Sequence, residues 1–240
     1  MRELQLTSAW QQNGPNWVGF LTTTWNETFV ETVNLAYGGA TVDAALIPQY
    51  LPTVLSVKQQ VNEEFIPTYA PRPDFLPWQP ESTLFAIWIG INDVNNAYQW
   101  ANKSEVFPLD IAEYASLMVN PSKLYMMHFL TVSQDKLYSS GARNFLFLNV
   151  PPVDRSPSTV LNSPSSPSIQ KPEISAWNAN VSHIASNLSS TYQDATTFVF
   201  DTNALFNDVL DDPCCHAETC AYKNTTGFCD SCMYNASIHL

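Results

Sequence analysis

The sequence predicts an α/β fold in which helices alternate with the strands of a parallel sheet. Three short segments are apolar over most of their length, at residues 83–90, 143–150 and 196–202. Continuous hydrophobicity is typical of strands that are buried on both faces, and segments with helical spacing separate these three along the chain. This order favours a doubly wound sheet with helices on both of its faces.

The first part of the chain predicts one further strand and one helix. Residues 29–44, FVETVNLAYGGATVDA, indicate a short strand that enters a turn at Gly38 and Gly39. Residues 54–66 have apolar side chains at helical spacing, and a proline-rich linker separates them from the next strand.

Further helical segments are expected at residues 110–142, 172–193 and 203–212. Pro121 is expected to break the first of them, because proline lacks the backbone N–H that a helix interior requires. Gly141 is expected to stop it, and Pro172 to open the second. The sequence contains no internal repeat, and we treat residues 1–240 as a single domain.

The composition excludes some classes of partner. The formal net charge is −12 at pH 7, and only 13% of the residues are charged, against about a quarter in an ordinary domain. Binding of nucleic acid requires clustered Lys and Arg, so nucleic acid is not an expected partner. No segment approaches the ~20 consecutive apolar residues that cross a bilayer, so the expected protein is not a membrane protein.

Several features are typical of a secreted glycoprotein. Four of the five cysteines could pair, which suits an oxidising compartment. The start of the chain, MRELQLTSAW, has no charged-then-apolar signal pattern, and we therefore expect that it is not the ancestral N-terminus. Candidate glycosylation sites of the form Asn-x-Ser/Thr stand at Asn26, Asn102, Asn180, Asn187, Asn224 and Asn235.

The candidate site lies where the predicted strands end, because ligands of doubly wound sheets bind beyond the carboxyl ends of the strands. The Gly38-Gly39 turn, the Gly90-Ile91-Asn92-Asp93 turn and the turn after Asn149 should meet there. A backbone N–H at a glycine and the amide of Asn92 are the components of an oxyanion hole. The alternative is an ordinary turn in which Asn92 caps a helix.

Four blocks of sequence, in this order, resemble one known family: NGPNWVGFLTTTWN, NLAYGGATVDA, GINDV and FLFLNVPPVDRSP. Together they resemble the SGNH (GDSL-type) hydrolases, and most of all the fungal secreted acetylesterases of carbohydrate esterase family 16. The resemblance runs from about Asn13 to about Phe228. It implies a three-layer α/β/α, flavodoxin-like fold that hydrolyses acetyl and other short acyl esters, often on plant-cell-wall sugars.

The resemblance also assigns roles to residues. Gly39 matches the family's oxyanion glycine and Asn92 its oxyanion asparagine, while Gly90 and Asp93 match the block around that asparagine. In the family, the nucleophile is the serine of a Gly-Asp-Ser block that follows the first strand. No Gly-Asp-Ser occurs in this sequence, and Ser8 does not match the block, so Ser8 is interpreted as a loop residue.

The catalytic base of the family is a histidine near the C-terminus. His239, in the final MYNASIHL, is the best match to it, although Leu240 stands where proline is usual. We therefore expect an incomplete family fold, which is truncated at both ends and lacks the first strand of the sheet together with its nucleophile.

A second constellation consists of Cys214, Cys215, Cys220, Cys229 and Cys232, with His216 among them. The spacing Cys229-x-x-Cys232 is compatible with a metal site or with redox chemistry, and a zinc site would need a tetrahedral set of thiolates. The glycosylation sites and the resemblance favour structural disulfides, with zinc and redox chemistry as the alternatives. The odd count leaves one thiol unpaired.

The expected protein is therefore a secreted, monomeric ester hydrolase that uses no cofactor and no metal and acts on a small-molecule or carbohydrate ester. Trp78, Tyr98 and Trp100 are candidates for stacking on a sugar, although packing is the ordinary role of aromatic residues. The alternative is a non-catalytic remnant or a carbohydrate-binding pseudoenzyme.

Overall fold

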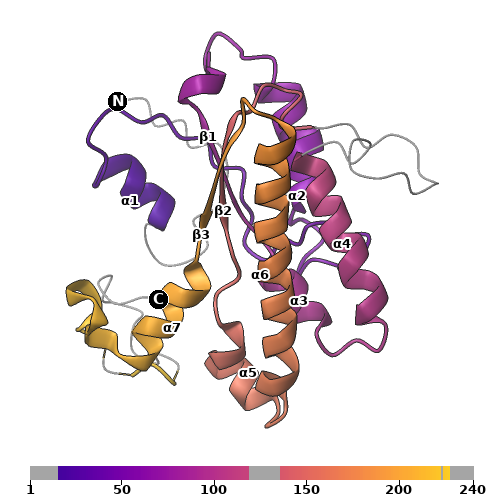
Figure 1. Ribbon diagram of the computed structural model, residues 1–240, viewed down its shortest axis with the longest axis vertical. Helices are drawn as coiled ribbons and strands as arrows, with labels where there is room; N and C mark the ends of the chain where they lie inside the picture. Colours follow the sequence, from indigo (N-terminus) through magenta and orange to yellow (C-terminus); the bar gives the residue numbers. More distant parts are fainter. Residues whose placement is uncertain (1–15, 119–135, 223, 228–240) are drawn as a thin grey trace.

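A parallel sheet forms the centre of the protein. The structure, a computed structural model, describes residues 16–118, 136–222 and 224–227 (Figure 1). Within them, β1 (Leu84–Trp88), β2 (Asn144–Leu148) and β3 (Thr196–Phe200) pair in parallel in the order β1-β2-β3. The α/β class and the three predicted strands are confirmed.

Helices of very different lengths connect and flank these strands. The helix α2 continues directly as a π-helix, and short 3-10 turns lie at Pro80–Ser82, Val153–Arg155, Pro213–Cys215 and Ala217–Thr219. The helices are α1 (Trp17–Thr23), α2 (Val57–Gln59) with its π-helical continuation (Gln60–Tyr69), α3 (Ile91–Ala97), α4 (Lys103–Met118), α5 (Pro157–Asn162), α6 (Ser166–Thr191) and α7 (Thr202–Asp211).

The helix expected to open at Pro172 begins earlier, at Ser166, so Pro172 lies inside α6. Contacts with other parts of the chain stabilise the turns of α6 that precede Pro172. Gln170 is fully buried; it accepts a hydrogen bond from the Thr159 hydroxyl at 3.1 Å and donates one to Asn95 at 3.2 Å. The local sequence, rich in serine and proline, does not indicate these partners.

The helix α4 also begins earlier than expected, at Lys103 rather than at Asp110. Pro121, which was expected to break this helix, lies outside the described residues.

The prediction of a strand within residues 29–44 is wrong, since this segment joins no sheet in the described part of the chain. Its backbone pairs instead with the first residues of α2. The amides of Val57 and Lys58 donate to the carbonyls of Thr41 and Val42 at 2.9 and 3.0 Å. The carbonyls that a neighbouring strand would have bonded are thus satisfied by the N–H groups of a helix N-terminus.

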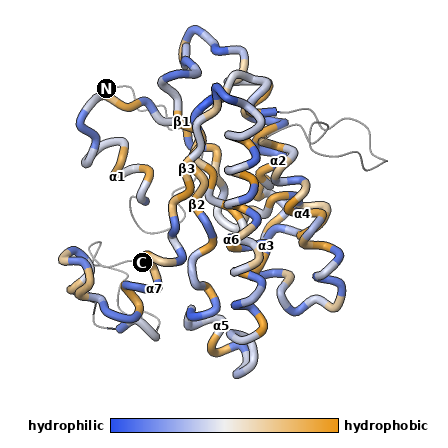
Figure 2. The backbone as a smooth tube through the Cα atoms, viewed as in Figure 1, coloured by the Kyte–Doolittle hydropathy of each residue, from blue (hydrophilic) through white to orange (hydrophobic). Residues whose placement is uncertain are grey.

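One face of the sheet is covered by α2, α4 and α6, which lie on the same side of it in Figure 1. Phe145 and Phe147 of β2 point to this side and are fully buried. They pack with apolar side chains from all three helices, among them Val61, Leu117 and Val181. The hydrophobic residues along the strands and helices are shown in Figure 2.

The opposite face differs from the expectation of a sheet covered on both sides. Leu84, Phe198 and Phe200 share this face by strand register, and each is about half exposed in the described structure, at 53%, 54% and 47%. The helix α1 lies on this side, where the ring of Trp17 contacts that of Trp88 at 6.1 Å between centroids. The described residues therefore form one full helical layer and part of a second.

No helix among the described residues is both long and apolar enough to cross a bilayer.

Candidate functional site

Gly90 lies between β1 and α3, at a point where the backbone needs a residue without a side chain. Gly90 has φ +113° and is the residue that precedes the first turn of α3. A Cβ atom at this position would lie 2.1 Å from Nε1 of Trp177, which packs from α6. Both the positive φ and the indole therefore require glycine.

Asn92 lies in the first turn of α3, and its side chain reaches across to another loop. Its Nδ2 donates a hydrogen bond to the carbonyl of Ala40 at 2.8 Å. The interpretation of Asn92 as a helix cap is wrong, since Gly90 occupies the cap position and no side chain caps the helix. An amide nitrogen carries two hydrogens, and this bond uses one of them to orient Asn92.

The Gly38-Gly39 turn comes to the same place. Ala40 donates to the Tyr37 carbonyl at 3.2 Å, and Gly39 has φ +86°, which glycine adopts without strain. A Cβ at Gly39 would meet the Cβ of Tyr50 at 3.3 Å. The structure thus joins the two predicted donor loops through Ala40, directly beyond the carboxyl end of β1.

The third predicted loop follows β2 and is held by its own hydrogen bonds. The Asn149 side chain donates to Asp201 Oδ1 at 2.8 Å and accepts from the Thr202 hydroxyl at 2.8 Å and the Asn203 amide at 2.9 Å. The Asn149 carbonyl accepts from the indole N–H of Trp88 at 3.0 Å. Asn149 therefore connects the ends of the three strands, and its side-chain amide forms structural hydrogen bonds.

Beneath the donor loops, Asp93 of the predicted turn lies beside a second buried carboxyl group, that of Asp110, which the sequence pattern did not single out. Asp93 and Asp110 are both fully buried, and Asp93 Oδ1 accepts a hydrogen bond from the Val42 amide at 2.7 Å. The two carboxyls lie close enough for each to shift the pKa of the other. Asp93 Oδ2 and both Asp110 oxygens have no partner of good hydrogen-bond geometry in the described part of the chain.

Electrostatics distinguishes the two carboxyls. Burial raises the pKa of Asp93, but hydrogen bonds from Asp110 and from backbone N–H groups oppose the rise. Burial raises the pKa of Asp110 far above its usual range, and the neighbouring Asp93 charge raises it further. A signal for Asp110 exists in the sequence: it shares one helical face with Tyr114 and Leu117, which are apolar core positions of α4.

The serine and histidine candidates cannot be placed relative to the donor loops. Ser8 and His239 are both outside the described residues. His183 is exposed on α6, as expected for a solvated helix position. The structure therefore brings Gly39 and Asn92 together and leaves the base and the nucleophile as predictions.

The aromatic candidates have structural partners. Trp78 packs at the amino-terminal end of the sheet, against Phe65 and Phe85, and its indole donates to the Tyr69 carbonyl at 2.6 Å, so its expected place near the site is wrong. The buried Tyr98 hydroxyl accepts hydrogen bonds from two side-chain amides. Trp100 is half-buried in the loop that leads to α4.

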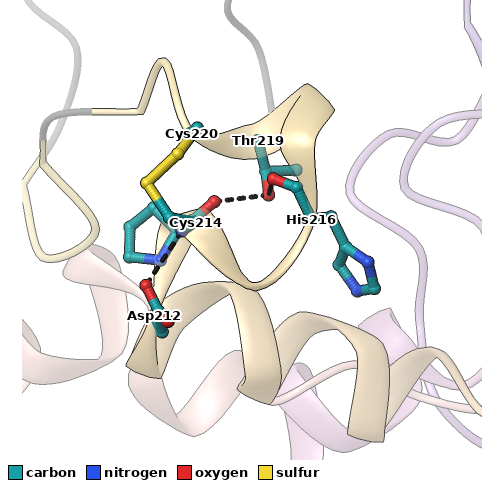
Figure 3. The surroundings of a disulfide bond; sticks show 6 residues. Asp212, Cys214, His216, Thr219 and Cys220 are labelled. Carbon is teal, nitrogen blue, oxygen red and sulfur yellow. Dashed lines mark hydrogen bonds between the residues drawn. A yellow bond between two sulfur atoms is a disulfide. The ribbon is translucent and has the colours of Figure 1, made fainter.

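The cysteine-rich segment contains a disulfide between Cys214 and Cys220 (Figure 3). Cys214 and Thr219 are also held by hydrogen bonds to Asp212 at 2.9 Å and to the Pro213 carbonyl at 2.6 Å. The ring of His216 points away from the sulfur atoms in Figure 3. Among the residues that the structure describes, no cluster of His, Cys, Asp and Glu could hold a metal ion.

We expect mass spectrometry without reduction to find two disulfides and one thiol among the five cysteines. Among the cysteines that the structure describes, Cys215 is exposed and has no disulfide partner, so it is the residue that an alkylating reagent should label. Cys229 and Cys232 lie outside the described residues and are expected to supply the second bond. Stoichiometric zinc, whose removal by a chelator unfolds the protein, would contradict this expectation and indicate a metal site.

Most of the candidate glycosylation sites are accessible. Asn180 is half-buried on α6 and donates to the Ala176 carbonyl, and Asn235 lies outside the described residues. The exposed candidates are Asn26, Asn102, Asn187 and Asn224.

The parallel sheet, with Asn92 bonded to Ala40 beyond the carboxyl end of its edge strand, defines an α/β protein whose candidate site is in the usual place for this architecture. Residues 6–231 match the GDSL-like lipase/acylhydrolase family. The chain belongs to this family. It is also similar to an acetylesterase of Thermothelomyces thermophilus, at 38% identity over 213 residues, which are 87% of this chain and 64% of that protein. The chain thus spans about two thirds of the length of that relative.

Proposed function

We propose that this chain supplies the oxyanion-binding part of an ester hydrolase that removes acetyl or other short acyl groups. The observation that carries the proposal is the bond from Asn92 to the Ala40 carbonyl, which orients a side-chain amide beside the Gly39 turn. Membership of the acylhydrolase family and similarity to an acetylesterase support the same reaction class.

In this proposal, a serine attacks the acyl carbon and a histidine takes its proton, so that an acyl-enzyme forms and is then hydrolysed. The Gly39 amide and the free N–H of Asn92 would donate to the oxygen that becomes negative in the transition state. His239 is proposed as the base, and the nucleophile as the serine of a Gly-Asp-Ser block that is not part of this sequence. Acetylated carbohydrates outside the cell are the proposed substrates, and the proposed active form is a monomer.

The test compares the 240-residue chain with a chain extended by a family-like first strand, a Gly-Asp-Ser block and a C-terminal helix. Both are assayed for acetate released from a short-chain acetyl ester. We expect turnover from the extended chain only, because the shorter one has no serine in the nucleophile block to form an acyl-enzyme, and a base without its supporting segment is poorly placed.

Comparable turnover by the two chains would overturn this placement of the nucleophile. A serine of the present sequence would then perform the attack, and Ser8 would be the first to replace. If neither chain hydrolyses the ester while both are folded, the result favours the second candidate function, a non-catalytic carbohydrate-binding protein. The absence of Gly-Asp-Ser from the 240 residues is the observation that supports this second candidate.

A further inference from the structure

The donor loops are held by two consecutive residues of α3. Asn92 donates to the Ala40 carbonyl at 2.8 Å, and Asp93 accepts from the Val42 amide at 2.7 Å. On the other side, the N-terminus of α2 holds the carbonyls of Thr41 and Val42. The position of this loop relative to Asn92 therefore depends directly on the Asp93 carboxylate, which makes the bond to Val42.

The ionised form of Asp93 would be unfavourable in this buried place unless a neighbouring group supplied a proton to it. Asp93 and Asp110 are fully buried, three of their four carboxyl oxygens have no partner of good hydrogen-bond geometry among the described residues, and each carboxyl shifts the pKa of the other. Two ionised carboxylates so placed would repel strongly in a medium that screens them poorly. The pair can persist only if one member keeps a proton and donates it to the other. Asp93 has three backbone donors, from Val42 and from two residues at the start of α3, whereas Asp110 has one, from Asp43, so the charge belongs on Asp93 and the proton on Asp110.

We infer that Asp110 is a positioning residue, a neutral carboxylic acid that donates its proton to Asp93 so that Asp93 can hold the Val42 amide and, with Asn92, fix the donor loop. Asp110 touches neither donor itself and acts only through Asp93. Its effect on an oxyanion rests on the proposed function, whereas the experiments below need no turnover.

The other ionisable groups around the pair do not replace this proton. Lys58 forms ion pairs with Asp43 at 2.7 Å and with Glu113 at 3.4 Å, at the edge of the cluster. Tyr114 lies one helical turn beyond Asp110 and is fully buried, and burial followed by the Asp93 charge raises the pKa of its hydroxyl. At the start of α4, Lys103 pairs with Glu173 of α6 at 2.8 Å.

The arrangement predicts a pH dependence with a definite sign. Because the pKa of Asp110 is raised in the folded state, the folded protein holds a proton that the unfolded chain releases above the ordinary carboxyl pKa of about 4. The stabilisation is complete below that pH and is lost as the pH rises toward the raised pKa of Asp110. Over this window, the contribution of one proton to the unfolding constant changes by about tenfold per pH unit.

The first experiment measures the unfolding constant of the full chain by urea denaturation between pH 5 and 8. Asp110→Asn supplies a non-titrating N–H donor to Asp93, so the ratio of the wild-type constant to that of the variant should rise by about tenfold per pH unit. Asp154→Asn is the matched control beyond β2: burial also raises the pKa of Asp154, but the charges of Lys171 and Arg155 oppose the rise, so the ratio for this variant should change less with pH than the ratio for Asp110→Asn. A ratio of wild type to Asp110→Asn that does not change with pH would overturn the inference.

The second experiment separates positioning from space filling. Asp110→Leu removes the donor and keeps a side chain of similar length. Hydrogen exchange at the Val42 amide should then accelerate by more than tenfold, relative to exchange at the Phe147 amide of the same variant. Asp110→Asn keeps a donor and should preserve the protection of the Val42 amide. Equal protection of Val42 in the Leu and Asn variants would show that Asp110 only fills space. If the Leu variant does not fold, the carboxyl ¹³C resonance of Asp110 in the wild type decides: a carboxylic acid at pH 7 supports the inference, and a carboxylate contradicts it.

Discussion

Replacing Gly90 with alanine is expected to destabilise the protein by about 3–5 kcal/mol, of the same order as the whole free energy of unfolding of a marginally stable domain. Two costs combine. The residue must keep a positive φ of +113°, which costs a non-glycine residue about 1–3 kcal/mol, and the new Cβ would lie 2.1 Å from the Trp177 indole. Overpacking of a core adds about 1–3 kcal/mol. Urea denaturation followed by circular dichroism measures the loss.

Gly141→Ala is the matched control for this prediction. Gly141 has almost the same φ, +106°, but the atom nearest to the new methyl group would be Nη2 of Arg72 at 2.3 Å, the end of a flexible side chain. Arg72 can move where the packed indole of Trp177 cannot, so the control should lose only about 1–3 kcal/mol, the strain of the positive φ. Equal losses for the two variants would show that the Trp177 contact does not restrict Gly90.

Replacing Asn92 with alanine is expected to lower kcat for acetyl ester hydrolysis by about a hundred- to a thousand-fold, the usual effect of losing one oxyanion donor. The variant is made in the extended chain that carries the nucleophile block. KM should change little, because the donor acts mainly on the charge that develops in the transition state. Steady-state kinetics on a short-chain acetyl ester provides the measurement.

Asn96→Ala is the control on the same helix. Asn96 also donates to a carbonyl of the neighbouring loop, that of Pro48 at 3.2 Å, but it lies one turn further from Gly90. Its removal should leave kcat within about twofold, because an exposed hydrogen bond contributes only about 1 kcal/mol to stability and none to the transition state. If Asn92→Ala keeps its kcat in a normally folded protein, Asn92 is only a structural residue of α3.

Local sequence was sufficient to predict three strands of the sheet, but not the structure of the segment that leads to Gly39. The strands of the sheet are short apolar runs whose neighbours cannot continue them, such as Gly90 after β1 and Pro151 after β2. The loops of Gly39 and Asn92 do lie together, but the reasoning that placed Gly39 there assumed a strand within residues 29–44, and this segment joins no sheet in the described part of the chain.

The limits of helices were less predictable, because contacts distant in sequence override local preference. Pro172 lies inside α6, where it was expected at the start, and the buried bonds of Gln170 to Thr159 and Asn95 hold the additional turns. Similarly, residues 29–44 have the composition of a strand but bond to the N-terminus of α2.

By itself, then, the sequence determined the α/β class and the three strands, because hydrophobic pattern is a local property of the chain. Only the tertiary structure decided why Gly90 must be glycine, since the obstacle is the indole of Trp177 on a distant helix. The tertiary structure also decided the environment of Asp110, and with it which protonation state is favoured; its identity as an aspartate does not indicate this. Burial against Asp93 makes its charged form unfavourable, and burial depends on which helices pack together rather than on any spacing in the sequence.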